Sequence, residues 1–159
     1  MYIRRFTEQD ANEVSKLIIT TFQISNSKDY PSEVIKELIS RHQSDDILKK
    51  AELAHFYVAQ EEEKIIGCGA ISSNEQAKDE SFISSIFVLP EKQGQGVGRL
   101  IIEALESDGL FLASKRIELN ASITGLGFYI KLGYTFKNGI TEPDKEGLYC
   151  LEKRRIIMI

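Results

Sequence analysis

The stretch Gln93-Gly94-Gln95-Gly96-Val97-Gly98-Arg99 decides how the rest of this 159-residue sequence is interpreted. Its alternating glycines permit positive φ angles and let the backbone approach a ligand closely. An apolar pattern with helical spacing follows at Leu100, Ile101, Ala104 and Leu105, which predicts that the glycines precede a helix. The unpaired amides and positive dipole end of that helix would then face the loop. The stretch therefore predicts a binding site for an anion such as a pyrophosphate.

Two other phosphate-binding loops fit this stretch less well. A P-loop requires a lysine directly after its last glycine, and Arg99 stands there instead. A dinucleotide-binding loop requires a small residue at the same position, although Glu118 lies where a ribose-binding acid would be expected. Residues 90–93 also separate the glycines from the preceding strand by more than that turn allows. A glycine-rich turn without a ligand is the remaining alternative.

Strands and helices are predicted on both sides of the loop. Alternating or β-branched segments predict strands at residues 2–6, 55–60, 65–71, 81–89, 116–120, 134–136 and 148–152. Helical patterns follow the capping pair Thr7 and Asp10, follow Pro31, and include Ile47, and a further short helix is expected at 126–132. Residues 72–79 are expected to form a polar link and residues 138–147 a solvated loop. This order predicts one α/β domain with a mixed central sheet flanked by helices.

Length and charge limit the class of protein. Residues 1–159 are expected to form a single domain, with a core at about 2–153 and a tail or strand extension at 154–159. The formal net charge of -4 and the pI near 5.3 argue against a nucleic-acid partner, because such proteins are usually basic. No apolar segment approaches the roughly 20 residues that span a bilayer, and no secretory signal is apparent. A cytoplasmic protein without membrane or nucleic-acid partners is expected.

Cysteine and histidine positions do not predict a metal site. Cys68 and Cys150 form no Cys-x-x-Cys pair and lie far from both histidines, so each is expected to be a buried apolar residue. His42 with Asp45 and Asp46 could mimic a metal cluster, but a polar helix end explains the three residues better. No metal is expected.

Two motifs carry a resemblance to a known family. The loop pattern Gln93-x-x-Gly96-x-Gly98 after the strand residues 85–90, and the downstream segment 128–134 (Phe-Tyr-Ile-Lys-Leu-Gly-Tyr), resemble the GNAT (Gcn5-related N-acetyltransferase) superfamily. The resemblance implies a GNAT-like fold in which a splayed strand pair holds the cofactor. It also implies acetyl-CoA as co-substrate, and direct attack within a ternary complex by a primary amine of a small molecule or peptide.

The resemblance also assigns roles to residues. The main chain of Ile86, Phe87 and Val88 would pair with the pantetheine arm, and a backbone N–H near Val88 would polarise the thioester carbonyl. The amides of Gln93, Gly94, Gln95, Gly96, Val97, Gly98 and Arg99 would hold the pyrophosphate. Tyr129 would be the general acid that protonates the leaving thiolate. Ser122 would stand where the family commonly has an asparagine contact to pantetheine, and Gly125 replaces the usual alanine.

Several residues are candidates for the general base. The protein-lysine-acetylating branch of the family has a glutamate where Phe82 stands here. Glu80 is the chosen candidate, and Glu118 or the hydroxyls of Ser84 and Ser85 acting through water are alternatives. The missing glutamate also leaves open a second function, a non-catalytic acyl-CoA-binding or sensor domain on the same fold.

Acceptor binding is expected from the more variable parts of the chain. These parts are the helices between residues 13 and 51 and the loop at 138–147. The apolar residues 156–159 would extend the last strand, pack against a second subunit or form a frayed end, so a homodimer is one expectation.

Overall fold

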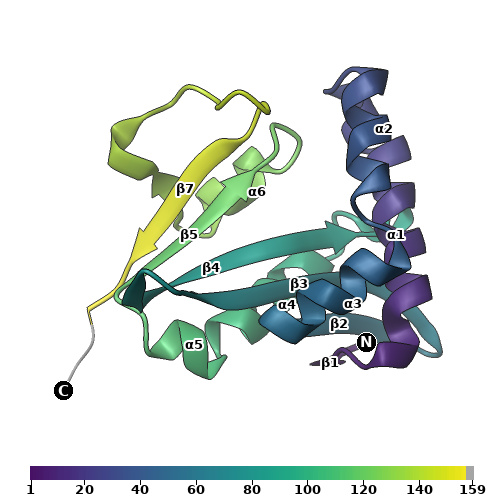
Figure 1. Ribbon diagram of the computed structural model, residues 1–159, viewed down its shortest axis with the longest axis horizontal. Coiled ribbons are helices and arrows are strands. Elements are labelled where there is room, and N and C mark those ends of the chain that lie inside the picture. The colour runs from purple at the N-terminus through teal and green to yellow at the C-terminus, as the bar shows by residue number, and fades with distance from the viewer. Residues whose placement is uncertain (157–159) are drawn as a thin grey trace.

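A seven-stranded sheet in the order β1-β2-β3-β4-β5-β7-β6 forms the centre of the computed structural model, which describes residues 1–156 (Figure 1). Neighbouring strands are antiparallel except β4 and β5, which are parallel. The sheet is therefore mixed, as the sequence predicts. The strands are β1 (Tyr2–Arg5), β2 (His55–Glu61), β3 (Lys64–Asn74), β4 (Ala77–Val88), β5 (Arg116–Ala121), β6 (Thr135–Phe136) and β7 (Tyr149–Arg154).

Helices cover both faces of the sheet. Helices α1 and α3 pack on one face of strands β2 to β4, and α4 and α5 pack on the other face (Figure 1). No helix within residues 1–156 has the length and apolar character needed to cross a bilayer. The α-helices are α1 (Ala11–Ile24), α2 (Ser32–Ser40), α3 (Ser44–Leu53), α4 (Val97–Glu106), α5 (Gly109–Leu112) and α6 (Leu126–Lys131). Short 3₁₀ turns are η1 (Glu8–Asp10), η2 (Asn26–Lys28), η3 (Pro90–Lys92) and η4 (Lys137–Gly139).

Two glycines on β3 bring α4 close to the sheet. A Cβ atom at Gly69 would lie 2.6 Å from side-chain carbons of Ile101 and Ile86, and one at Gly67 would lie 2.8 Å from Ile101. Since real Cβ atoms do not approach other atoms so closely, these positions require glycine. The close packing fixes the helix that follows the glycine loop, and so fixes the loop itself.

Strands β4 and β5 separate toward their carboxyl ends. They pair only from Glu80 to Ile83 on β4, although β4 continues to Val88. At the same place β4 contains a β-bulge, because the two steps from Cys68 to Ala70 on β3 face the three steps from Phe87 to Ser84 on β4. Ser85 within the bulge has a φ of 58°, which is rare for a residue with a side chain. The predicted splayed strand pair is thus present, and it opens at the bulge.

The elements predicted from the sequence are confirmed in order and type, with one difference in length and one additional short helix, α5, that the sequence analysis did not predict. Residues 72–79 were expected to form a polar link, but β3 extends to Asn74 and β4 begins at Ala77. The β3–β4 hairpin continues past the core, where its side chains are largely solvated, so polarity there does not mark a loop. Of the apolar tail at 156–159, Ile156 is exposed, and residues 157–159 lie outside the described part of the chain.

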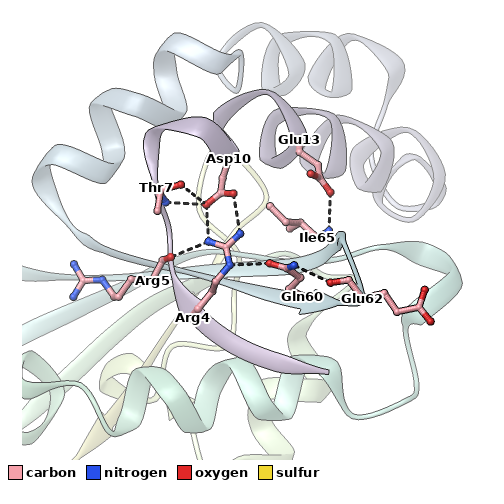
Figure 2. Close-up of polar contacts among 8 residues, drawn as sticks. All are labelled: Arg4, Arg5, Thr7, Asp10, Glu13, Gln60, Glu62 and Ile65. Carbon is pink, nitrogen blue, oxygen red and sulfur yellow. Dashed lines mark hydrogen bonds and ion pairs between the residues drawn. The ribbon is translucent and has the colours of Figure 1, made fainter.

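The capping pair that the sequence predicts holds the 3₁₀ turn η1, which leads directly into α1 (Figure 2). The backbone N–H of Thr7 donates to Asp10 Oδ2 at 2.8 Å. The Arg4 guanidinium donates to both carboxylate oxygens of Asp10, at 2.8 and 2.9 Å. Nearby, the Glu13 carboxylate accepts a hydrogen bond from the backbone N–H of Ile65 at 2.6 Å. These contacts tie the first helix to β1 and β3.

Replacing Asp10 by Asn is expected to lower the free energy of unfolding by about 1 kcal/mol at neutral pH. The hydrogen bonds from Arg4 hold the pKa of the Asp10 carboxyl below its ordinary 3.8. A lowered pKa in the folded state stabilises the fold above the unfolded-state pKa, and this contribution disappears as pH falls through the folded-state value. Urea unfolding at neutral pH and near pH 3 measures the difference, with the exposed Glu8→Gln as control. An equal difference at both pH values would contradict the prediction.

Candidate active site

A cavity of about 850 Å³ opens where β4 and β5 separate. Its walls come from α1, α2, α3, the carboxyl end of β4, the glycine loop, the end of β5 and α6. The bulge and the missing strand pairing together create this space. Most residues that the sequence assigns to the site meet here.

The glycine loop forms one end of the cavity. Gln93, Gly94, Gly96, Gly98 and Arg99 all line it. Gly94 and Gly96 have φ angles of 77° and 87°, and Gly96 is the N-cap of α4. The first turn of α4, all within the described residues, contains no acidic side chain. The amides and the dipole of α4 are therefore available to an anion, as the sequence predicts.

Gln95 and Val97 differ from the other loop residues. Neither is among the described residues that line the cavity. The Gln95 amide donates to the Glu91 carbonyl at 3.1 Å on the exposed side of the loop. Val97 is only 3% exposed and packs against β3 at Gly67. Its side chain therefore holds α4 in place, a role that the sequence pattern does not distinguish from ligand binding.

The end of β4 lines the cavity with Ile86, Phe87 and Val88. The backbone N–H of Leu89 donates to the Ile66 carbonyl of β3 at 2.9 Å. Because successive amides of a strand point to opposite sides, the N–H of Val88 points away from β3. The Val88 carbonyl points the same way and accepts a hydrogen bond from the Gln93 side chain at 3.0 Å. An amide donor thus faces the side of β4 that β5 leaves open.

Tyr129 lies on α6 and lines the cavity, with only 8% of its surface exposed. Its ring packs edge-on against Phe128 and Tyr134, with centroid distances of 5.1 and 6.3 Å. The phenolic oxygen makes no hydrogen bond within the described part of the chain. Burial raises the pKa of this phenol above its ordinary value of 10.0. The hydroxyl therefore stays protonated and is free to donate.

Glu80 and Glu118 do not join the cavity. They are absent from its lining among residues 1–156, and both pair with the largely buried Arg116 guanidinium. Glu152 pairs with the same guanidinium at 2.6 Å. The hydrogen bonds that Glu118 accepts from Lys137 and Arg116 lower its pKa and outweigh the opposing effect of burial. The structure therefore places the sequence candidate Glu80 in a structural ion-pair cluster, apart from the cavity.

The serine candidates lie in the cavity wall. Ser84 and Ser85 line it, and the Ser85 hydroxyl is buried without a hydrogen-bond partner among the described residues. Ser122 also lines the cavity, and its hydroxyl accepts a hydrogen bond from the Gly125 amide at 3.2 Å. Ser122 thus supports the start of α6, which carries Tyr129.

Both segments expected to bind the acceptor border the cavity. Glu37 of α2 and Glu146 of the loop at 138–147 line it. Tyr30 joins these segments, since its hydroxyl donates to the Gly147 carbonyl and accepts from the Ile123 amide, each at 2.9 Å. Thr124 further bonds Asp29 across the same gap. The opening between β4 and β5 is therefore bridged by side chains.

His42 is a cavity residue that the sequence interpretation missed. Its ring lines the cavity and packs edge-on against Phe22, with a centroid distance of 5.1 Å. Asp46, by contrast, caps α3 by accepting from the Gln43 amide at 2.9 Å, as expected of a polar helix end. No local sequence signal separates the two, because the apolar neighbours of His42, Phe22 and Phe87, come from distant segments of the chain.

Neither cysteine has the lowered pKa that is typical of a reactive thiol. Cys68 is fully buried and donates to the Ser85 carbonyl at 3.2 Å. Burial raises the pKa of its thiol to about 12, which keeps it protonated. Cys150 is half-buried, and its pKa is also raised by burial. Within residues 1–156, no three His, Cys, Asp or Glu side chains gather in a metal-binding group.

Comparisons with known proteins agree with this architecture. The family described as "Acetyltransferase (GNAT) domain" matches residues 8–148. No curated protein sequence matches the chain. A PaiA N-acetyltransferase from Thermoplasma acidophilum, solved in complex with coenzyme A, is similar with a TM-score of 0.81 and 15% identity, over 97% of this chain and 98% of that one.

Two further solved structures support the same fold. A GCN5-related N-acetyltransferase from Rhodopseudomonas palustris matches with a TM-score of 0.78 and 17% identity, over 97% of this chain and 95% of that one. A GNAT family acetyltransferase from Brucella melitensis, in complex with acetyl-CoA, matches with a TM-score of 0.62 and 25% identity, over 94% and 86% of the two chains. The predicted fold class is confirmed.

Proposed function

The chain belongs to the acetyltransferase (GNAT) domain family and is an acyl-CoA-dependent acetyltransferase, and we propose that it acetylates a primary amine of a small molecule or peptide. The amine attacks acetyl-CoA directly, within a ternary complex. The observation that carries this proposal is the single cavity that joins the glycine loop, the open edge of β4 and Tyr129. It gives the cofactor and the acceptor a shared space.

The residues present fit the cofactor. The positive-φ glycines Gly94 and Gly96 leave room beside the amides of the α4 N-terminus, where the pyrophosphate is bound. Arg99 adds a cationic side chain at the same end. The open edge of β4 at Ile86 to Val88 pairs with the pantetheine arm. This fit is supported by the CoA bound in the Thermoplasma acidophilum structure and the acetyl-CoA in the Brucella melitensis structure.

Two groups of the chain assist the transfer. The Val88 N–H, aimed into the opening, stabilises the negative charge that develops on the thioester oxygen as the amine attacks. The new C–N bond forms as the C–S bond breaks, and Tyr129 donates its phenolic proton to the departing sulfur. The phenol suits this role because its raised pKa keeps it protonated at neutral pH.

Release of free CoA thiol tests the proposal. Purified protein and acetyl-CoA are incubated with a panel of amines that includes polyamines, amino acids, arylamines and peptides. We expect release that depends on the acceptor, together with a product heavier by one acetyl group in mass spectrometry.

The same assay separates the enzyme from the alternative acyl-CoA-binding or sensor domain. A sensor would bind acetyl-CoA in a calorimeter but release no thiol with any amine of the panel. That outcome would contradict the proposed acetyl transfer while leaving the cofactor site intact.

A further inference from the structure

Acetyl transfer to an amine needs a base as well as an acid, because the attacking nitrogen must lose a proton. The predicted carboxylate, Glu80, is held by Arg116 away from the cavity. Two other carboxylates, those of Glu37 and Glu146, line the cavity but belong to exposed residues at its rim. His42, in contrast, is half-buried in the wall.

The ring of His42 is held in one orientation. Its Nδ1 lies 2.6 Å from the Leu38 carbonyl oxygen, which can only accept a hydrogen bond, so Nδ1 carries the proton. The backbone carbonyl of His42 accepts from the Ser15 hydroxyl at 2.7 Å. Nε2 makes no hydrogen bond within residues 1–156 and is therefore left with a free lone pair.

The ring also stands beside the reacting end of β4. Its centroid lies 6.1 Å from that of Phe87, and both rings pack edge-on against Phe22. Phe87 directly precedes Val88, whose N–H faces the thioester carbonyl in the proposed function. His42 follows the C-terminal end of α2 and Tyr129 lies on α6, so the two side chains line the cavity from different segments.

We propose that His42 Nε2 is the general base that removes the proton from the attacking amine. This inference rests on the proposed acetyl transfer. As the nitrogen forms its bond to the acetyl carbon, one N–H proton passes to Nε2, and the sulfur takes the Tyr129 proton. The products are the N-acetyl amine and CoA thiol, and the imidazolium returns its proton through solvent while Tyr129 regains one. No oxidant or further reactant is needed.

The charges around His42 favour its neutral form. Burial is the main reason that its pKa lies below the ordinary 6.5. Lys50 on α3 and the neighbouring Arg41 also disfavour a positive charge on the ring, while Asp46 and the Leu38 carbonyl oppose this effect. The facing residues of α1 and β4, Phe22 and Phe87, are apolar. The ring is therefore neutral at neutral pH, and its Nε2 is able to accept a proton.

His42→Asn tests the assignment with little disturbance. The Asn amide nitrogen can take the place of Nδ1 and donate to the Leu38 carbonyl, whereas nothing replaces Nε2. We expect kcat to fall by about tenfold or more, with the acetyl-CoA Kd nearly unchanged. His55→Asn is the matched control, because His55 lies on β2 and bonds Asp108 outside the cavity. It should retain wild-type kcat.

The pH profile of kcat distinguishes a base from a packing residue. The wild-type profile should fall on the acid side with a pKa below 6.5, since protonated His42 accepts no proton. His42→Asn should lose this limb. The apparent pKa of this acid limb should be the same with two amines of different basicity, because the titrating group is a residue of the protein and not the amine. A limb that moves with the amine, or that persists in His42→Asn, overturns the assignment.

Chemical rescue completes the test. Exogenous imidazole should restore part of the kcat of His42→Ala, and no restoration in a variant that still binds acetyl-CoA would count against His42. The proposed function fails separately, if wild-type protein releases no CoA with any amine. Wild-type release together with an unaffected His42→Asn overturns only the role of His42.

Discussion

Replacing Tyr129 by Phe is expected to lower kcat for acetyl transfer by about tenfold or more, with the acetyl-CoA Kd changed by less than about twofold. The substitution removes only the hydroxyl, which makes no hydrogen bond within residues 1–156. The edge-on packing against Phe128 and Tyr134 is retained. The expected decrease in kcat therefore comes from the missing proton donor to the leaving sulfur. Steady-state kinetics and calorimetry measure the two quantities.

Tyr134→Phe is the matched control for this prediction. Tyr134 is also buried, but its hydroxyl donates to Glu106 Oε2 at 2.8 Å, and the residue does not line the cavity among the described residues. Loss of the Tyr134 hydroxyl should lower the free energy of unfolding by about 1 kcal/mol and leave kcat unchanged. An unchanged kcat in Tyr129→Phe would remove Tyr129 from the mechanism. Equal losses in both variants would point to packing instead of proton transfer.

Replacing Gly96 by Val is expected to weaken acetyl-CoA binding by about tenfold or more, since strain of this kind is worth about 1 to 3 kcal/mol. Gly96 caps α4 with a φ of 87°, a conformation that β-branched residues strongly disfavour. No described atom lies within 4 Å of a Cβ built there, so the effect comes from the backbone and not from a clash. The loop must move to relieve the strain, and its amides then no longer converge on the pyrophosphate.

Two variants control for this effect. Gln95→Ala changes the same loop on its exposed side, where the side chain bonds only the Glu91 carbonyl, and its Kd should stay within about twofold of wild type. Gly109→Val adds the same side chain at the start of α5, where no described atom lies within 4 Å of the new Cβ. Wild-type affinity in a folded Gly96→Val protein would contradict the role of this loop geometry.

Local sequence signals predicted most of the fold. The glycine loop and the apolar spacing that follows it place α4, and the pair Thr7 and Asp10 places the start of the first helix. These features depend on residues that are close in the sequence. The extended β3–β4 hairpin was missed because solvated strands lack the apolar alternation that indicates a buried face. The bulge at Ser85 was missed because it depends on the register between two strands.

The sequence predicted the parts of the candidate site that depend on main-chain geometry. It did not predict the side-chain positions that depend on tertiary contacts. The glycines at positions 94 and 96 predict the positive φ angles that the structure shows there. Glu80 instead lies opposite Arg116 in the sheet register, a pairing visible only once β4 and β5 are aligned. His42 reaches the cavity because the turn after α2 places its ring beside Phe87 of β4, and the two residues lie far apart in the sequence. Chemistry that depends on such long-range contacts is not encoded in local spacing.

The short pairing between β4 and β5 has a consequence for how the molecule holds together. Four residue pairs, from Glu80 to Ile83 on β4, are the only strand ladder in the described chain that joins β1 to β4 with β5, β7 and β6. A pantetheine arm that forms hydrogen bonds along the rest of β4 would add contacts beyond the four residue pairs that join β4 to β5. Binding of the cofactor should then slow amide hydrogen exchange in β5 and β7. The part of the protein that carries Tyr129 would then be held more firmly to β4 whenever the cofactor is bound.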